Sequence, residues 1–131
     1  MKHRNYVYFQ PNDKDPKDDY GDCAVRSFCV VEELEWLEAY DKMSAIAREV
    51  QCPFNVKYGF EHIMKTLGYT YHGISNKKGT TRPTVAEFAR HNDVTAILVV
   101  ANHYVAIKNK KYYDTWDSGE KKLYGYWVKQ K

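Results

Sequence analysis

The chain has few cysteines and no long apolar run, and these absences exclude several classes of protein. Its 131 residues include only three Cys, an odd number with no CxxC pair, so neither a disulfide framework nor a zinc site is expected. No window is long enough for a transmembrane helix, and residues 1–6 lack the apolar core of a secretory signal. We therefore expect a cytoplasmic protein with free thiols and no membrane association.

An excess of charge is also lacking, because the formal net charge is only +3. A specific nucleic-acid partner is therefore not expected. The basic residues gather near the end, where seven Lys fall between Lys108 and Lys131. We interpret them as a solvated strand edge. A nucleic-acid or acidic-partner module is the alternative, and it predicts steeply salt-dependent binding.

The remaining composition is that of a globular domain, with 44% hydrophobic residues and 12 Tyr. We expect one domain over residues 1–131, because no linker or repeat interrupts it. Spacing and breakers predict helices at 23–31, 34–51, 59–67 and 85–92. Strands are predicted at 6–9, 69–72, 95–100, 104–107, 112–116 and 123–128, and loops at 11–21 and 77–83. Helices thus precede most strands, which indicates an α+β fold with an antiparallel sheet.

Cys23 is the first candidate for chemistry, because it starts an apolar helix directly after Gly21 and Asp22. Asp22 is the predicted N-cap. A helix N-terminus favours the reactive thiolate, and its amides can hold the oxyanion of an acyl-transfer intermediate. The alternative is a plain buried cysteine, which is what we expect for Cys29 and Cys52.

His103 is the candidate base, because it lies between two apolar strands and would give a Cys–His arrangement with the nucleophile. Such a base needs an orienting acid. If 109–110 is a two-residue turn, a bulge would place Asp117 opposite His103, and without one Asp114 lies one diagonal step away on the same face. Both carboxylates can reach, and we prefer Asp117. Alternatively, both Asp simply cap the strand end in water.

Three short motifs carry a family resemblance when they are taken together. They are Gly-Asp-Cys-Ala-Val-Arg at 21–26, Asn-His-Tyr-Val-Ala-Ile at 102–107 and Tyr-Asp-Thr-Trp-Asp-Ser at 113–118. In this order they resemble the Cys-His-Asp/Asn motifs of the papain-like cysteine peptidase superfamily. The closer resemblance is to small papain-like proteins of bacteria and their phages, and it spans about residues 20–128.

The resemblance implies a papain-like α+β fold, with N-terminal helices packed against a C-terminal antiparallel sheet. It implies Cys23 as nucleophile, His103 as general base and acid, and Asp117 or Asp114 as orienter. The reaction would be hydrolysis of an amide, isopeptide or thioester bond in a peptide or protein substrate. No cofactor and no metal ion are implied.

The chain departs from the family pattern at one place. Papain-like enzymes commonly carry Gln or Asn five or six residues before the cysteine, where this chain has Asp18 and Lys17. An ionised Asp cannot donate to an oxyanion. The hole would then combine the Cys23 amide with Lys17, Asn12 or Gln10. The departure also supports an alternative function, a catalytically inactive relative whose groove binds peptide.

Overall fold

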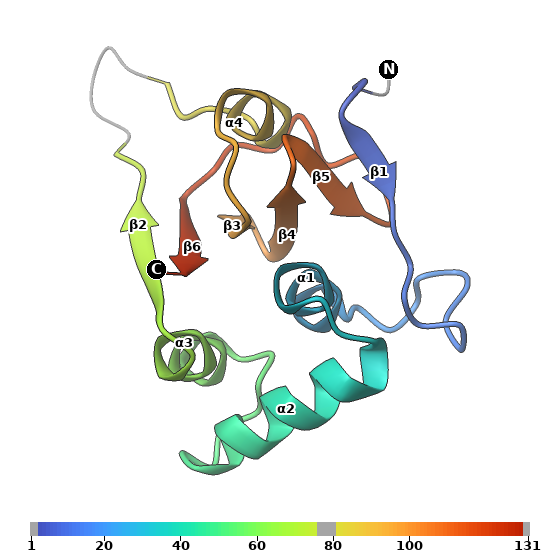
Figure 1. Cartoon of the computed structure of the whole chain (residues 1–131), viewed down its shortest axis with the longest axis vertical. Helices are drawn as coiled ribbons and strands as arrows, with labels where there is room; N and C mark the ends of the chain where they lie inside the picture. The colour runs from blue at the N-terminus through green and yellow to red at the C-terminus, as the bar shows by residue number, and fades with distance from the viewer. Residues whose placement is uncertain (1–2, 76–80, 130–131) are drawn as a thin grey trace.

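The computed structural model describes residues 3–75 and 81–129, and within them it shows helices around a six-stranded sheet (Figure 1). The helices are α1 (Cys23–Glu32), α2 (Trp36–Arg48), α3 (Lys57–Thr66) and α4 (Val85–His91). The strands are β1 (Tyr6–Tyr8), β2 (Tyr69–Gly73), β3 (Ala96–Val100), β4 (His103–Lys108), β5 (Lys111–Asp114) and β6 (Gly125–Lys129). The predicted α+β class is confirmed. The loop expected at 77–83 lies partly outside the described residues.

The sheet has the order β1-β5-β4-β3-β6-β2, and it is mixed rather than antiparallel. Strand β1 runs parallel to β5, with Tyr6 opposite Tyr112, while the other described pairs are antiparallel. The expectation of a purely antiparallel sheet is therefore wrong. A parallel pair needs a long connection, and most of the chain lies between these two strands.

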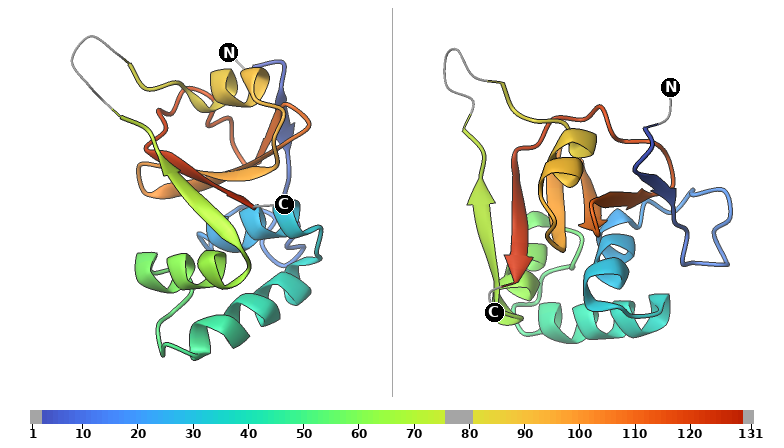
Figure 2. Two further views of the ribbon diagram at one scale, coloured as in Figure 1. Left: turned by 60° about the vertical axis from the view of Figure 1, so that its left-hand side comes forward. Right: turned by 45° about the horizontal axis from the view of Figure 1, so that its top comes forward.

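Helices cover both faces of the sheet (Figure 2). Helices α1, α2 and α3 lie on one face, and α4 lies on the other. Successive side chains of a strand point to opposite faces of the sheet, so β3 contributes to both hydrophobic cores. Ile97 belongs to the core under α1–α3, while Ala96 and Leu98 belong to the core under α4. The prediction of helices first and sheet last therefore holds for α1–α3 but not for α4, which follows β2.

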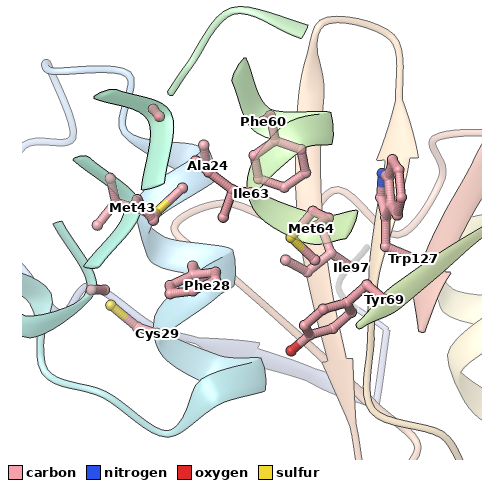
Figure 3. Packing of buried hydrophobic residues seen from close by; sticks show 13 residues of the cluster. Ala24, Phe28, Cys29, Met43, Phe60, Ile63, Met64, Tyr69, Ile97 and Trp127 are labelled. Carbon is pink, nitrogen blue, oxygen red and sulfur yellow. The ribbon is translucent and has the colours of Figure 1, made fainter. Parts of the chain in front are cut away.

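Helix α1 is the central helix of the larger core (Figure 3). All residues from Ala24 to Val30 are buried, and Phe28 packs in the same cluster as Phe60 of α3 and Ile97 of β3. Replacing such a buried Phe with Ala typically costs about 3–5 kcal/mol. Burial on all sides therefore holds the helix, and with it the position of Cys23 at its N-terminus.

Local sequence signals explain most element boundaries. The capping box of Thr84 and Glu87 starts α4 as predicted. The β4–β5 turn has two residues, Asn109 and Lys110, both with positive φ as a type I′ turn requires. Among the described residues, none of the helices combines the length and apolar character needed to cross a bilayer.

Candidate active site

The fold brings the two predicted reacting residues together. Cys23 is the first residue of α1, and His103 is the first residue of β4. The turn from β3 into β4 passes through Asn102, whose φ of 53° lets the chain reverse sharply. The Cys23 thiol and the His103 ring lie close enough that their interaction lowers the pKa of the thiol and raises the pKa of the ring. This is the arrangement of a nucleophile and its base.

Asp114 is the acid that contacts the histidine. Nε2 of His103 lies 2.7 Å from Oδ2 of Asp114. Because Nε2 is engaged by the carboxylate, Nδ1 is the nitrogen that remains for the Cys23 sulfur. Cys23, His103 and Asp114 thus lie in the order that a nucleophile, its base and an orienting acid would require.

Asp117 does not contact His103, so our preference for it as orienter is wrong. Its carboxylate accepts hydrogen bonds from the backbone amides of His3 and Gly119, both at 3.0 Å, and from the Tyr112 hydroxyl. The reason is the strand register. The β4–β5 ladder shows no bulge, which leaves Asp114 on the diagonal position that reaches His103.

Asp114 is only 1% exposed, and its other hydrogen bonds fix its direction. Ser118 Oγ donates to Oδ2 at 2.6 Å, while the Thr115 amide donates to Oδ1 at 2.8 Å. Arg26 approaches Oδ1 at 3.2 Å. A carboxylate with this many donors holds one orientation, which is what the orienter of a catalytic histidine needs.

Arg26 was not singled out in the sequence, although it is buried at the centre of the site. Its Nη1 lies 2.7 Å from Asp22 and 3.0 Å from Asp18, while its Nη2 reaches Asp114. Asp22 occupies the N-cap position of α1 as predicted, but its carboxylate accepts from the Trp36 indole at 2.8 Å and does not cap the helix amides. The signal in the sequence was the spacing of Asp22 and Arg26, which is i,i+4 on a helix.

The loop before α1 contains a cluster of carboxylates that resembles a metal site. Carboxylate oxygens of Asp15, Asp18 and Asp22 lie within 4.8 Å of one another. However, Arg26 already provides a cation to Asp18 and Asp22. Asp15 accepts from two backbone amides of its own loop. We therefore interpret the three carboxylates as part of a hydrogen-bonded network that stabilises the loop.

The surroundings of Cys23 favour the thiolate. Burial raises the pKa of the thiol, but the hydrogen bond and charge of His103, the Tyr104 backbone and Arg26 outweigh it, so that the pKa is lowered. For His103, burial lowers the pKa, yet the bonds to Asp114 and Cys23 raise it to about 9. Cys29 differs, because burial and the charge of Asp22 raise its pKa to about 12. Cys23 is thus paired with a cationic partner, whereas Cys29 is not stabilised as a thiolate.

Two of the side chains that we considered for the oxyanion hole, Gln10 and Asn12, form hydrogen bonds within the described loop. Gln10 donates to the Asp15 carbonyl and accepts from the Asn12 amide, and Asp18 binds Arg26 and Thr115. None of Gln10, Asn12 and Lys17 lines the cleft at Cys23. The amides in the first turn of α1 remain, because the Asp22 side chain does not cap them.

Cys23 and His103 open into a cleft of about 580 Å³. Its walls come from the α2–α3 loop, α3, the sheet and the β3–β4 turn, and they are rich in aromatic rings. Apart from Cys23 and His103, the lining comprises Asn55, Lys57, Phe60, Glu61, Tyr71, Val99, Val100, Asn102, Tyr104, Tyr124 and Trp127. Sequence spacing did not identify this lining, since it is assembled from segments far apart in the chain.

Comparison with known proteins adds no family assignment. No family model, no curated protein and no solved structure matches this chain. What can be said of function therefore depends on the geometry of the site and on the motifs quoted above.

Proposed function

We propose that this protein is a cysteine-dependent hydrolase of papain-like type and fold, acting on an amide, isopeptide or thioester bond of a peptide or protein substrate. The observation that carries the proposal is the row of Cys23, His103 and Asp114, in which the ring interacts with the thiol and lies 2.7 Å from the carboxylate. Its position supports the proposal, because the nucleophile begins a buried helix and faces a cleft. The three free thiols fit the cytoplasm.

The reaction follows from this arrangement. The Cys23 thiolate attacks the substrate carbonyl carbon, and the amides at the start of α1 stabilise the negative charge on its oxygen. His103 then donates its Nδ1 proton to the leaving group as the carbon–leaving-group bond breaks, which leaves a thioester on Cys23. Water attacks the thioester while His103 accepts its proton. The carboxylic acid leaves, and Cys23 returns as the thiolate beside a protonated His103.

The first experiment is the alkylation rate of each cysteine against pH, followed by peptide mass spectrometry in the wild type and in His103→Ala. We expect Cys23 to react much faster than Cys29 near pH 6, because a thiolate paired with imidazolium forms below the ordinary thiol pKa. We also expect His103→Ala to remove this advantage. Equal reactivity of the three thiols, or reaction only on unfolding, would contradict the proposal.

Turnover is tested next on a library of fluorogenic peptides. We expect Cys23→Ala to abolish hydrolysis and Cys29→Ser to leave it nearly unchanged, since Cys29 is buried among apolar residues. Hydrolysis that survives Cys23→Ala would show that the nucleophile is assigned wrongly.

One observation favours a second candidate, an inactive papain-like protein that binds peptide. At the place where an amide donor is usual, Asp18 presents a carboxylate held by Arg26. A binding protein of this kind would bind peptide in the cleft without turnover, and Cys23 would show no selective alkylation.

The alternative that uses the C-terminal lysines receives less support from the described residues. Lys108 is paired with Glu33 and Lys129 is paired with Glu32, so that part of this positive charge is compensated within the chain. Compensated lysines attract a polyanion less strongly.

A further inference from the structure

The cleft beside Cys23 combines aromatic walls with a carboxylate. Phe60 stacks on Tyr104 with ring centroids 4.2 Å apart, and Tyr71 packs against Trp127 at 5.0 Å. Glu61, the next residue after Phe60 on α3, lines the same cleft and is half-buried. Aromatic faces and a carboxylate both attract cations, so this wall has the character of a cation site.

Glu61 is not compensated by the described part of the chain. Among residues 3–75 and 81–129, no hydrogen bond or ion pair to its side chain is formed, in contrast to Glu32, which has three partners. Lys57 lies one turn earlier and also lines the cleft, but it is exposed and makes no ion pair with Glu61. A half-buried carboxylate without a partner is stabilised when a cation binds to it.

The position of the Glu61 charge is consistent with its facing the rings. Burial raises the pKa of Tyr71, and the Glu61 charge raises it further. Burial likewise raises the pKa of Tyr104 to about 12, with contributions from Cys23 and then Glu61. The guanidinium of Arg82 lies over another lining ring, 5.1 Å from the ring centroid of Tyr124.

We propose that the cleft recognises a basic side chain, Lys or Arg, next to the scissile bond, with its cationic head between Glu61 and the faces of Tyr71 and Tyr104. The proposal specifies the substrate class of the hydrolase proposed above, and it rests on that function. The aliphatic stem of such a side chain would lie on Phe60 and Val99. A neutral side chain of the same length would leave the Glu61 charge partly desolvated and unpaired, which disfavours it.

The test uses a variant that lacks the proposed nucleophile, so that its ligands are not cleaved. We would titrate Cys23→Ala protein with N-acetyl-lysine methylamide and with N-acetyl-norleucine methylamide, following amide chemical shifts. The two differ only in the terminal ammonium. We expect the lysine ligand to bind about tenfold more tightly, because one cation–π contact together with one partly buried ion pair is of that size. The shifts should concentrate on residues of the cleft.

Glu61→Gln should bring the two ligands to nearly equal affinity, because it keeps the shape of the side chain and removes its charge. Asp41→Asn is the matched control: it removes one exposed carboxylate of α2 outside the cleft lining, so the preference should persist. Equal affinity of the two ligands, binding of neither, or a preference that survives Glu61→Gln would overturn the proposal.

Failure of this proposal is distinguishable from failure of the hydrolase function, because the titration requires no chemistry at residue 23. If Cys23 of the wild type is unreactive but the lysine preference depends on Glu61, the cation site stands and the hydrolase does not. If Cys23 is reactive and the preference is missing, the hydrolase stands and the basic substrate class is refuted.

Discussion

Replacing Asp114 with Asn should uncouple His103 from Cys23, whereas replacing Asp117 with Asn should not. The two substitutions are chemically identical and lie three residues apart. Only Asp114 contacts the ring, at 2.7 Å, while Asp117 binds two backbone amides and Tyr112. The pair therefore separates an effect on His103 from a general effect of losing a carboxylate in this loop.

The magnitude follows from the pKa of His103. Burial alone would lower this pKa below its ordinary value of 6.5, but Asp114 and Cys23 raise it to about 9. The difference between a pKa of 6.5 and a pKa of about 9 corresponds to a stabilisation of the charged ring, relative to the neutral ring, of about 3 kcal/mol. Asp114 makes the largest favourable contribution, so Asp114→Asn should return the pKa toward 6.5.

The sign of the effect on reactivity is fixed by this shift. The imidazolium that stabilises the Cys23 thiolate persists in the wild type up to about pH 9. In Asp114→Asn it is lost as the pH rises through the lowered pKa, and Cys23 then becomes an ordinary buried thiol. At pH 8 we expect alkylation of Cys23 to be at least about tenfold slower than in the wild type, since each pKa unit changes the ratio of charged to neutral ring tenfold.

The assay combines an NMR titration of the His103 ring with alkylation rates between pH 5 and pH 9. Circular dichroism checks that both variants remain folded. Ser118→Ala provides a milder perturbation, because it removes only the 2.6 Å hydrogen bond to Asp114 and should shift the titration less. If Asp117→Asn lowers the pKa of His103 while Asp114→Asn leaves it unchanged, the assignment of the orienter is refuted.

Three further predictions concern stability and the second cysteine. Arg26→Met should lower the free energy of unfolding in urea by about 3–5 kcal/mol, because it leaves buried carboxylates without their cation; a loss below about 1 kcal/mol would refute this role. Gly59→Ala should cost about 1–3 kcal/mol, since a Cβ there would lie 3.0 Å from the backbone carbonyl carbon of Pro53, whereas Gly73→Ala meets only an ordinary contact and should cost less. Cys29, with a pKa raised to about 12, should be alkylated at pH 8 only at the rate of unfolding; rapid labelling of native protein would contradict its burial.

The sequence predicted the elements of this fold well, because their signals are local. Turn residues and capping boxes fix where the β4–β5 hairpin and α4 occur. Helix α2 is shorter than the predicted 34–51, since the reciprocal capping box of Glu35 and Glu38 begins it at Trp36. At its other end the chain leaves the helix after Arg48 and passes through Gln51, which has a φ of 51°.

Pairing between distant segments was not predictable in the same way. A short apolar run such as 6–9 indicates a strand but contains no information about its neighbour. Its parallel alignment with β5 depends on the long connection and on the Asp114 carbonyl, which accepts from the Phe9 amide. The position of α4 on the second face likewise depends on which side of the strands is left uncovered.

The candidate site shows the same division. Cys23 and His103 were predictable because each begins an element, where a side chain is fixed and still accessible. The choice between Asp114 and Asp117 depended on a bulge that sequence cannot exclude, since one inserted residue changes which side chain faces the partner strand. Arg26 was given no role because the role of a charged residue inside an apolar helix depends on the partners that the fold brings to it.

Arg26 links the two halves of the site mechanically. It lies three residues after Cys23 on α1, and it holds Asp114, which in turn holds His103. One buried helix therefore positions Cys23 directly and His103 through the contacts of Arg26 with Asp114 and of Asp114 with His103. Because α1 is buried along its length, a shift of this helix would move both groups together and preserve their separation. Restoring the charge with Arg26→Lys should thus recover less than full Cys23 reactivity, since an ammonium lacks the fork that spans Asp22 and Asp114.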